Sequence, residues 1–406
     1  MNTCRICQSE FTPFLHFGNM PIANGFLTPD QFKDEYFFEL KVGFCASCGM
    51  VQLTEQPDPE QMFHQNYAFY SSTSNRMARH FRHFADLVKQ EIMKGSDPLV
   101  VEIGCNDGIM LQHFTSPGMR HLGIEPSANV ARVAQEKGIH TVSAFFDQKL
   151  AEELALEHGQ ADVILAANVM CHIPDLHTVF AGIRSLLKPD GRFLFEDPYL
   201  GDIVNKTSYD QIYDEHAFYF SLGSIRYMVS QYGLEVIDVA PQNVHGGSMR
   251  YHIAHKGAYT CSPAVSALAE KEERMQLGNP ETFSLFRHKV EQSRDNLHSL
   301  LKNLKDEGKQ IVGYGATSKS STVTNYCHIG PDLVDYISDT TPIKQNKFSP
   351  GVHIPVKPYE EFQNHYPDCA LLFAWNHAEE IFLKESAFKG SGGKWILYVP
   401  EVNIIS

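Results

Sequence analysis

The sequence has no hydrophobic run close to the roughly 20 consecutive apolar residues that a membrane-spanning helix needs. Its first residues carry no basic stretch followed by an apolar segment, so no secretory signal is expected. Basic residues are scarce, with 34 Lys and Arg against 48 Asp and Glu and a formal net charge of −14. This balance disfavours a nucleic-acid groove, because phosphate binding needs clustered Lys and Arg. We expect a cytoplasmic protein that binds neither nucleic acid nor a membrane, and nothing in the sequence indicates its oligomeric state.

The cysteines do not form the pattern of a disulfide-rich secreted protein. Four of the nine form two Cys-x-x-Cys pairs, made by Cys4, Cys7, Cys45 and Cys48, and the other five are scattered singly. Each pair can place two thiolates on one turn, and two such turns supply the closed tetrahedral ligand set of a structural zinc ion. The alternatives are two redox pairs or buried thiols. We favour zinc because of the paired spacing.

The 406 residues are too many for one ordinary core, and three segments differ in pattern. Residues 1–75 are rich in Cys, Phe and Tyr and predict a small zinc-binding domain. In 76–256, strand-like runs alternate with amphipathic helical stretches, which predicts a parallel, Rossmann-like α/β sheet. Within 257–406, a charged helical passage leads to a second, smaller Rossmann-like α/β domain. The predicted strands are 99–103, 120–125, 162–167, 192–196, 234–239 and 248–255, then 310–316, 332–337, 369–375 and 394–399.

The first strand of the middle segment runs into a glycine-rich turn, Gly104-Cys105-Asn106-Asp107-Gly108. Glycines let the backbone approach a nucleotide closely, as in dinucleotide-binding folds. The turn lacks the G-x-G-x-x-G pattern, and its acidic character, with Glu102 and Asp107, suits a cationic sulfonium better than a pyrophosphate. An ordinary βα turn or an NAD site are the alternatives. The turn therefore favours S-adenosylmethionine.

Three further residues are candidates for the same cofactor site. Glu125 closes the second strand, where a carboxylate can bind both hydroxyls of an adenosine ribose. Asn168 follows strand 162–167, at the sheet edge where ligands bind. Phe146, with Phe145, could border the adenine, although two adjacent phenylalanines are as common in a core.

Residues 209–220 interrupt the α/β alternation directly after strand 192–196 and concentrate ionisable groups. Removing a proton next to a ketone needs a base, and an imidazole titrates near neutral pH. We assign His216 as the base, Glu215 as the group that orients or polarises it, and Tyr213 as the donor to the enolate oxygen. His172 is a second candidate over the same crevice. The alternative is a polar lid packed by its aromatic side chains.

Three other segments are candidates for substrate contacts. Residues 66–74 interleave aromatic rings with hydroxyls, which suits a sugar or adenosine surface or, equally, a hairpin edge. Residues 243–250 hold a glycine turn that is otherwise a simple hairpin. The turn Gly313-Tyr314-Gly315 resembles an NAD loop, but the polar helix that follows suggests a diphosphate or nucleotide surface. The substrate-binding residues assigned are Tyr70, Ser72, His245, Gly246, Arg250, Ser318, Lys319, Asn325 and Lys344.

Taken together, the motifs closely resemble the sugar C-methyltransferase family that makes branched deoxysugars. The resemblance is co-linear over nearly the whole chain. It comprises the two Cys-x-x-Cys pairs, Tyr-x-x-Tyr-Ser-Ser, Glu-Ile-Gly-Cys-Asn-Asp-Gly, Ala-Asn-Val-Met-Cys-His-Ile-Pro-Asp, Tyr-Asp-Glu-His-x-x-Tyr-Phe, His-Gly-Gly-Ser-Met-Arg, Gly-Tyr-Gly-Ala-Thr-Ser-Lys and Asp-x-x-Pro-x-Lys-Gln.

This resemblance implies zinc in the first domain and S-adenosylmethionine in a class I methyltransferase sheet. It implies a nucleotide-diphosphate keto-sugar, carried by dTDP or GDP, between the middle and last domains. The usual reaction is methylation at C3 of a 4-keto-6-deoxy sugar through an enolate. His216 carries over as the base with Tyr213 and Glu215 as partners, and His172 and Tyr67 carry over as substrate-side or cofactor-side residues. An O- or N-methyltransferase on a similar sugar, or a binding module without activity, are the alternatives.

Overall fold

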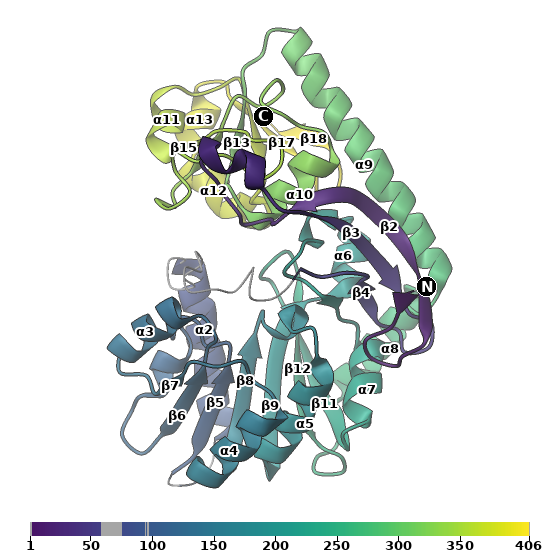
Figure 1. Ribbon diagram of the computed structural model, residues 1–406, viewed down its shortest axis with the longest axis vertical. Helices are drawn as coiled ribbons and strands as arrows, with labels where there is room; N and C mark the ends of the chain where they lie inside the picture. The colour runs from purple at the N-terminus through teal and green to yellow at the C-terminus, as the bar shows by residue number, and fades with distance from the viewer. Residues whose placement is uncertain (1, 58–74, 94, 96, 406) are drawn as a thin grey trace.

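The computed structural model describes residues 2–57, 75–93, 95 and 97–405, and it contains three β-sheets. Figure 1 shows the central domain below, the C-terminal domain above, and the N-terminal strands β2 and β3 arching beside the junction of the two. Tyr67, Tyr70 and Ser72 lie outside the described residues. The mixed α/β fold predicted from the sequence is confirmed.

The N-terminal sheet has the strand order β1-β2-β3-β4-β10. Its last strand comes from far along the chain, because Phe218 and Tyr219 pair antiparallel with Gln52 and Val51. The segment predicted to be catalytic therefore completes the sheet of the zinc module. The elements are β1 (Asn2–Thr3), β2 (Glu10–Pro21), the 3-10 helix η1 (Pro29–Asp34), β3 (Phe37–Phe44), β4 (Val51–Leu53) and β10 (Phe218–Tyr219).

The central sheet has the order β11-β12-β9-β8-β5-β6-β7 and is parallel except for β12, which is antiparallel to both neighbours. The strands are β5 (Leu99–Ile103), β6 (Arg120–Ile124), β7 (Thr141–Val142), β8 (Ala161–Ala167), β9 (Leu187–Pro198), β11 (Leu234–Gln242) and β12 (Ser248–His255). The order reverses between β5 and β8, and ligands of such sheets bind at the carboxyl ends of the strands beside that reversal.

Helices cover both faces of this sheet because its strands alternate their side chains. Val100 packs in the cluster that contains Phe84 of α2, whereas its neighbour Val101 packs with Phe180 of α5. The elements are α2 (Asn75–Leu87), the π-helix η3 (Val88–Ile92), α3 (Ala128–Glu136), α4 (Gln148–His158), α5 (Leu176–Leu186), α6 (Leu200–Lys206) and α7 (Leu222–Ser230), with 3-10 turns η4 (Leu111–Phe114), η5 (Met170–His172) and η6 (Tyr209–Gln211).

The C-terminal sheet has the order β15-β14-β13-β16-β17-β18, and only β18 is antiparallel. The strand expected at 332–337 begins only at Ile337, because Leu333 and Val334 donate to the Gly330 carbonyl in a turn. The elements are β13 (Ile311–Tyr314), α10 (Ser318–Tyr326), β14 (Ile337–Asp339), β15 (Val356–Pro358), α11 (Tyr359–Asn364), β16 (Cys369–Leu372), η7 (Trp375–His377), α12 (Ala378–Lys384), α13 (Ser386–Gly390), β17 (Lys394–Leu397) and β18 (Asn403–Ile405).

The predicted helical connector consists of two helices, α8 (Pro263–Arg274) and α9 (Pro280–Asp306). Figure 1 shows α9 running along the outer edge of the molecule toward the C-terminal domain. Phe283 of α9 stacks on Phe14 of the N-terminal module, with ring centroids 4.9 Å apart, and Leu297 and Leu301 are fully buried. One helix therefore packs on the N-terminal module and, further along, helps to form the core that this module shares with the C-terminal domain.

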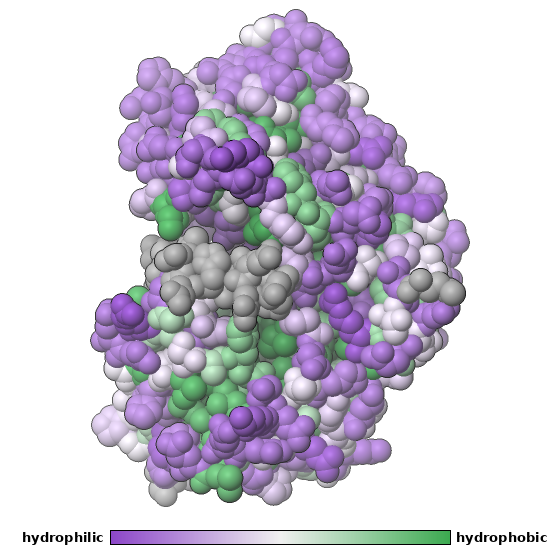
Figure 2. Space-filling view, viewed as in Figure 1, coloured by the Kyte–Doolittle hydropathy of each residue, from purple (hydrophilic) through white to green (hydrophobic). Residues whose placement is uncertain are grey.

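The part of the chain that the structure describes has no helix both long and apolar enough to cross a membrane. Figure 2 shows mostly hydrophilic residues over the C-terminal domain on one face, and hydrophobic residues gathered over the central domain.

The start of α7 depends on a carboxylate of another helix. Glu272 of α8 accepts hydrogen bonds from the N–H groups of Leu222 (2.6 Å) and Gly223 (3.1 Å) and from the Tyr199 hydroxyl (3.1 Å). We expect Glu272→Ala to lower the free energy of unfolding by about 3 kcal/mol, because three donors lose their acceptor and two of them, Tyr199 and Leu222, are buried. Glu270→Ala, on an exposed face of the same helix, is the control and should change it by less than about 0.5 kcal/mol. Equal stability of the two variants in urea unfolding would contradict this role.

Candidate active site

The four cysteines of the two Cys-x-x-Cys pairs converge in the N-terminal module. Cys4 Sγ lies 3.6 Å from Cys48 Sγ, and Cys7 Sγ lies 3.4 Å from Cys45 Sγ. All four sulfur atoms lie within 4.8 Å of one another. A disulfide needs about 2.05 Å, whereas sulfur ligands about 2.3 Å from a tetrahedral zinc ion lie about 3.8 Å apart. The donor set therefore fits zinc, and no ligand position remains open for chemistry.

The two turns that hold the sulfur atoms are built alike. In each, the residue after the second cysteine takes a left-handed backbone, at Gln8 (φ 60°) and Gly49 (φ 73°), and donates to the carbonyl of the first cysteine. Gln52 adds an outer contact, because its side-chain N–H lies 3.0 Å from Cys4 Sγ. Such donors stabilise a thiolate and orient it toward the metal.

A cavity of about 690 Å³ lies at the carboxyl ends of the central strands and reaches the C-terminal domain. Predicted cofactor residues that line it are Gly104, Asn106, Glu125, Phe146 and Asn168. Predicted catalytic and substrate residues that line it are His172, Tyr213, Glu215, His216, His245, Ser318, Lys319 and Lys344. The structure thus brings most of the predicted site to one cavity.

The glycine-rich turn forms one end of this cavity. Gly104 has φ +69°, and a Cβ there would lie 2.4 Å from a Val169 methyl group, so only glycine fits. The Glu125 carboxylate accepts the N–H groups of Asn106 (3.1 Å) and Ser127 (2.8 Å), and burial raises its pKa. Each carboxylate oxygen retains a second lone pair that can accept a hydrogen bond from a ribose hydroxyl.

Three predicted cofactor residues of this turn lie outside the cavity lining. Glu102 is buried inside strand β5, and its pKa is raised well above the usual range by burial and then by nearby Glu125. Asp107 forms an ion pair with Lys137 at 3.3 Å. A Cβ on Gly108 would lie 2.0 Å from the Ile139 Cδ1 atom. These three residues support the conformation of the turn and do not line the cavity.

Asn168 and Phe146 border the same end of the cavity. Asn168 takes a left-handed backbone (φ 56°), and its N–H donates to the Glu196 carbonyl at 2.7 Å. Among the described residues, the buried Asn168 Oδ1 has no hydrogen-bond partner, which fits an ammonium group such as that of S-adenosylmethionine. Phe146 is buried, while 53% of Phe145 is exposed, although both line the cavity.

His216 lies deep in the cavity wall with both ring nitrogens engaged. Nδ1 lies 2.8 Å from the Gln211 carbonyl, which can only accept, so Nδ1 carries the proton. Nε2 therefore holds the lone pair, and the Tyr213 hydroxyl donates to it at 2.8 Å. Burial, and then the neighbouring His172, lower the pKa of His216 well below its usual value, so the imidazole is neutral. The ring orientation comes from Gln211, where the sequence suggested Glu215.

His172 stacks on His216 with ring centroids 5.2 Å apart, and burial lowers the pKa of His172 to about 4. With Cys171 the two histidines place possible metal ligands within 4.8 Å of one another. Burial raises the pKa of the Cys171 thiol well above its usual value, and both nitrogens of His216 already have partners. These contacts leave His216 no free nitrogen for a metal ion at this cluster.

Residues 209–220, named here the catalytic strap, contact all three domains. Asp210 accepts hydrogen bonds from Trp375 Nε1 (2.6 Å) and the Tyr398 hydroxyl (2.8 Å) of the C-terminal domain. Asp214 accepts the Ala23 N–H of the N-terminal module at 3.0 Å. Burial raises the pKa of Asp214 and, with the added repulsion of Asp214, that of Glu215.

The C-terminal domain contributes a cluster of nitrogen groups to the cavity. The Lys319 ammonium donates to Asn376 Oδ1 at 3.3 Å. Burial, and then Lys319 and His377, lower the pKa of His245 to about 3. Asn376 and His377 were missed in the sequence, although they follow strand β16 at its carboxyl end, the same position that identified Asn168.

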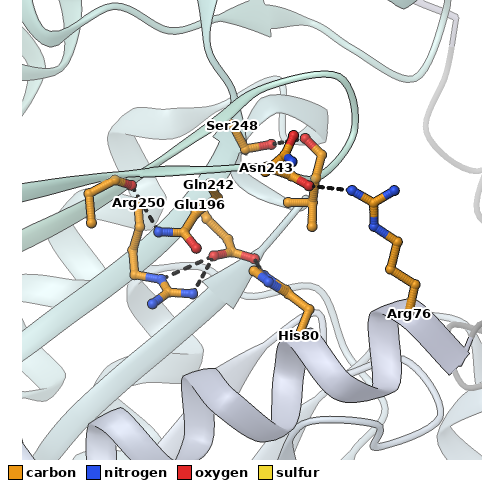
Figure 3. Close-up of polar contacts among 9 residues, drawn as sticks. Arg76, His80, Glu196, Gln242, Asn243, Ser248 and Arg250 are labelled. Carbon is orange, nitrogen blue, oxygen red and sulfur yellow. Dashed lines mark hydrogen bonds and ion pairs between the residues drawn. The ribbon is translucent and has the colours of Figure 1, made fainter. Parts of the chain in front are cut away.

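Arg250 does not reach the cavity. Its guanidinium donates twice to Glu196 Oε2, at 3.0 and 2.8 Å, and lies 3.4 Å above the ring of Phe84. Figure 3 shows His80 of α2 approaching the other Glu196 oxygen, and Arg76 of the same helix bonded to the Asn243 carbonyl. Arg250 therefore joins β12, β9 and α2 beneath the site.

Two other predicted substrate residues also lie outside the lining. Asn325 Nδ2 donates to the carbonyls of Ser321 (2.8 Å) and Pro350 (3.0 Å), which holds a loop of the C-terminal domain. Gly246 packs so tightly that a Cβ would lie 2.5 Å from the Trp375 ring. Both residues support neighbours of the cavity.

Comparison with known proteins agrees with this geometry. Three family models match: a zinc binding domain at 4–63, a methyltransferase domain at 74–239, and a C-methyltransferase C-terminal domain at 243–400. The C-methyltransferase NovU of Streptomyces niveus is 35% identical over 409 residues, covering all of this chain and 97% of that protein. The chain belongs to the C-methyltransferase family. It is an S-adenosylmethionine-dependent C-methyltransferase, and the predicted cofactors, S-adenosylmethionine and zinc, are confirmed.

Two other matches each cover less than half of the chain. The ubiquinone biosynthesis O-methyltransferase of Colwellia psychrerythraea is 31% identical over 101 residues, which is 24% of this chain and 41% of that protein. The magnesium protoporphyrin IX methyltransferase of Synechocystis covers 44% of this chain and 79% of its own, at 13% identity and a TM-score of 0.33. A likeness at that level supports no further conclusion.

We expect the purified C-methyltransferase to hold about one zinc ion per chain, because the four sulfur atoms form one closed site. Cys45→Ser should lose the metal and destabilise the N-terminal module, as zinc binding contributes directly to folding. Cys261→Ser, at an exposed single cysteine, should retain it. Metal analysis that finds the same zinc content in both variants would exclude this site.

Glu125 and Asp107 should differ in their effects on the donor. Glu125 lines the cavity, so Glu125→Gln should weaken S-adenosylmethionine binding about 10- to 100-fold, which corresponds to one hydrogen bond with a charged group. Asp107→Asn should mainly lower stability, because Asp107 pairs with Lys137 beneath the turn. A 2′-deoxy donor should hide part of the Glu125 effect in calorimetry. Undiminished affinity in Glu125→Gln would contradict the ribose role.

Proposed function

We propose that this C-methyltransferase transfers a methyl group to C3 of a nucleotide-diphosphate 4-keto-6-deoxy sugar through an enolate, in branched deoxysugar biosynthesis. One observation carries the proposal: His216 and Tyr213 are hydrogen-bonded to each other and line the same cavity as the glycine-rich turn at 104–108, here called the donor turn. Residues 1–75, 76–256 and 257–406 would act as the zinc, donor and nucleotide-sugar units, with dTDP or GDP as the carrier.

Forming the enolate requires a neutral base, and His216 meets that condition. Its lowered pKa keeps the imidazole unprotonated, and the Gln211 carbonyl fixes the tautomer that leaves the lone pair on Nε2. The C3–H bond breaks, the proton goes to Nε2, and the electron pair spreads onto the C4 oxygen. The imidazolium then forms within the catalytic strap.

Tyr213 links proton removal to stabilisation of the enolate oxygen. In the structure its hydroxyl donates a hydrogen bond to His216 Nε2, the atom that has to accept the proton. When the hydroxyl turns to the substrate carbonyl oxygen, it frees Nε2 and donates to the atom on which negative charge develops. One rotation would therefore prepare both the base and the oxyanion donor.

Glu215 and Lys344, which line the same cavity, would also contact the sugar. Burial shifts Glu215 toward its neutral form, in which a carboxylic acid can donate a hydrogen bond to a substrate oxygen. Burial lowers the pKa of Lys344, whose ammonium donates to the Ala316 carbonyl at 2.8 Å. When bound, S-adenosylmethionine would supply an electrophilic methyl group, which C3 of the enolate would take as the methyl–sulfur bond breaks and S-adenosylhomocysteine leaves.

The nucleotide diphosphate would bind toward the C-terminal domain. Lys319, His245 and His377 gather there, and burial of Lys319 lowers its pKa, a cost that a bound phosphate would offset. Ser318 opens helix α10 at the same wall. With the diphosphate bound there, the keto group of the sugar would lie next to Tyr213 and His216 of the catalytic strap.

The sharpest test is solvent exchange at C3. With S-adenosylhomocysteine bound in place of the donor, the wild-type enzyme should wash deuterium into C3 of the keto-sugar. His216→Ala should abolish exchange and lower the rate of transfer by about 10²- to 10⁴-fold or more, because it removes the base. Because the pKa of His216 is lowered, exchange should fall only well below the usual histidine pKa of ~6.5.

His172→Asn is the matched control, since it changes the stacked histidine and leaves Nε2 of His216 in place. Exchange lost in His172→Asn but retained in His216→Ala would reverse their roles. Tyr213→Phe should retain slower exchange. The product should carry a quaternary carbon in its NMR spectrum, and a methoxy group would refute the enolate route.

A further inference from the structure

Asn24 belongs to the N-terminal module, yet it lines the active-site cavity. It lies in the loop between β2 and η1, which is fixed at the preceding residue. The Ala23 N–H donates to Asp214 Oδ1 at 3.0 Å, and the Ala23 carbonyl accepts from the Ser321 hydroxyl at 2.6 Å. The loop is therefore held between the catalytic strap and helix α10.

The side chain of Asn24 has no hydrogen-bond partner among the described residues, although its Oδ1 atom is buried. More than about 90% of buried polar groups in proteins have a partner, and leaving one unpaired costs about 1–3 kcal/mol. An amide offers one acceptor and two donor hydrogens. Asn24 is half-buried and borders the cavity, so its unpartnered amide oxygen is available for a ligand.

Asn24 lies at the end of the cavity where we propose that the methyl acceptor, the keto-sugar, binds. Through Ala23 it is joined to Asp214, which neighbours both Tyr213 and Glu215 in the strap. Two residues further along, the Phe26 ring lies 4.8 Å from the Lys344 ammonium. This loop is thus held against Asp214, the chain neighbour of Tyr213 and Glu215, and lies close to Lys344, which we assign to the sugar.

We propose that Asn24 binds a sugar hydroxyl of the acceptor, with its amide oxygen accepting from the hydroxyl group. For the identity of the acceptor, this inference rests on the proposed function. The zinc-binding module is then part of the acceptor site, and zinc acts on the reaction by holding the fold that presents Asn24. A deoxy acceptor leaves the amide unpaired and binds more weakly, so Asn24 contributes to specificity.

Asn24→Leu, which has a similar shape and no polar atoms, tests the contact in the full-length holoenzyme. We expect the KM for the keto-sugar to rise about tenfold or more, with unchanged zinc content and unchanged affinity for S-adenosylhomocysteine. Asn19→Leu, at an exposed position of β2 in the same module, should change none of these values. Acceptors that lack one hydroxyl each should identify the partner, because the correct analogue binds equally weakly to the wild type and to Asn24→Leu.

Thermal unfolding without acceptor separates a binding role from a structural one. If the amide has no partner in the free protein, Asn24→Leu should unfold at the same temperature as the wild type or higher. A midpoint several degrees lower, or an unchanged KM, would overturn the proposal. If the wild type neither binds nor methylates any nucleotide keto-sugar, the proposed function fails. The unfolding comparison still shows whether the Asn24 amide lacks a partner in the free protein and is therefore available to a ligand.

Discussion

The fixing of the catalytic strap by three domains is the constraint on which the rest of the site depends. Strand β10 completes the N-terminal sheet, Asp214 accepts from the loop of Ala23, and Asp210 accepts from two aromatic residues of the C-terminal domain. A segment this polar would be exposed if any one of its neighbours were absent. His216, Tyr213 and Glu215 are therefore held in place by contacts to the N-terminal and C-terminal domains together.

Burial of the strap also sets the protonation states that the chemistry needs. Desolvation disfavours charge, so it lowers the pKa values of His172 and His216 and raises those of Asp214 and Glu215. The site thus contains a neutral imidazole that can accept a proton and carboxyl groups shifted toward the form that donates a hydrogen bond. Both properties come from one physical cause, the exclusion of water by surrounding domains.

The donor end is simpler because it is local. Strand β5, the turn at Gly104 and the carboxylate of Glu125 come from one short passage of the chain, and the roles we propose for them follow from the position of a turn at the carboxyl end of a strand. Arg250 and Asn325 show where such reasoning stops. Both lie in motifs of the resemblance or beside them, yet their side chains bind Glu196 and backbone carbonyls outside the cavity.

The sequence by itself determined the paired cysteines, the alternation of strands and helices, the donor turn and the cluster around His216, because each is a pattern within a short stretch. Only the tertiary structure decided that Gln211 orients the histidine, that β10 joins the N-terminal sheet, and that Asn24 and His377 reach the same cavity. The last two outcomes depend on packing between segments far apart in the chain, and the Gln211 contact depends on how residues 209–220 fold between their neighbours. No local periodicity or spacing encodes which side of a loop will face a ligand once its neighbours are in place.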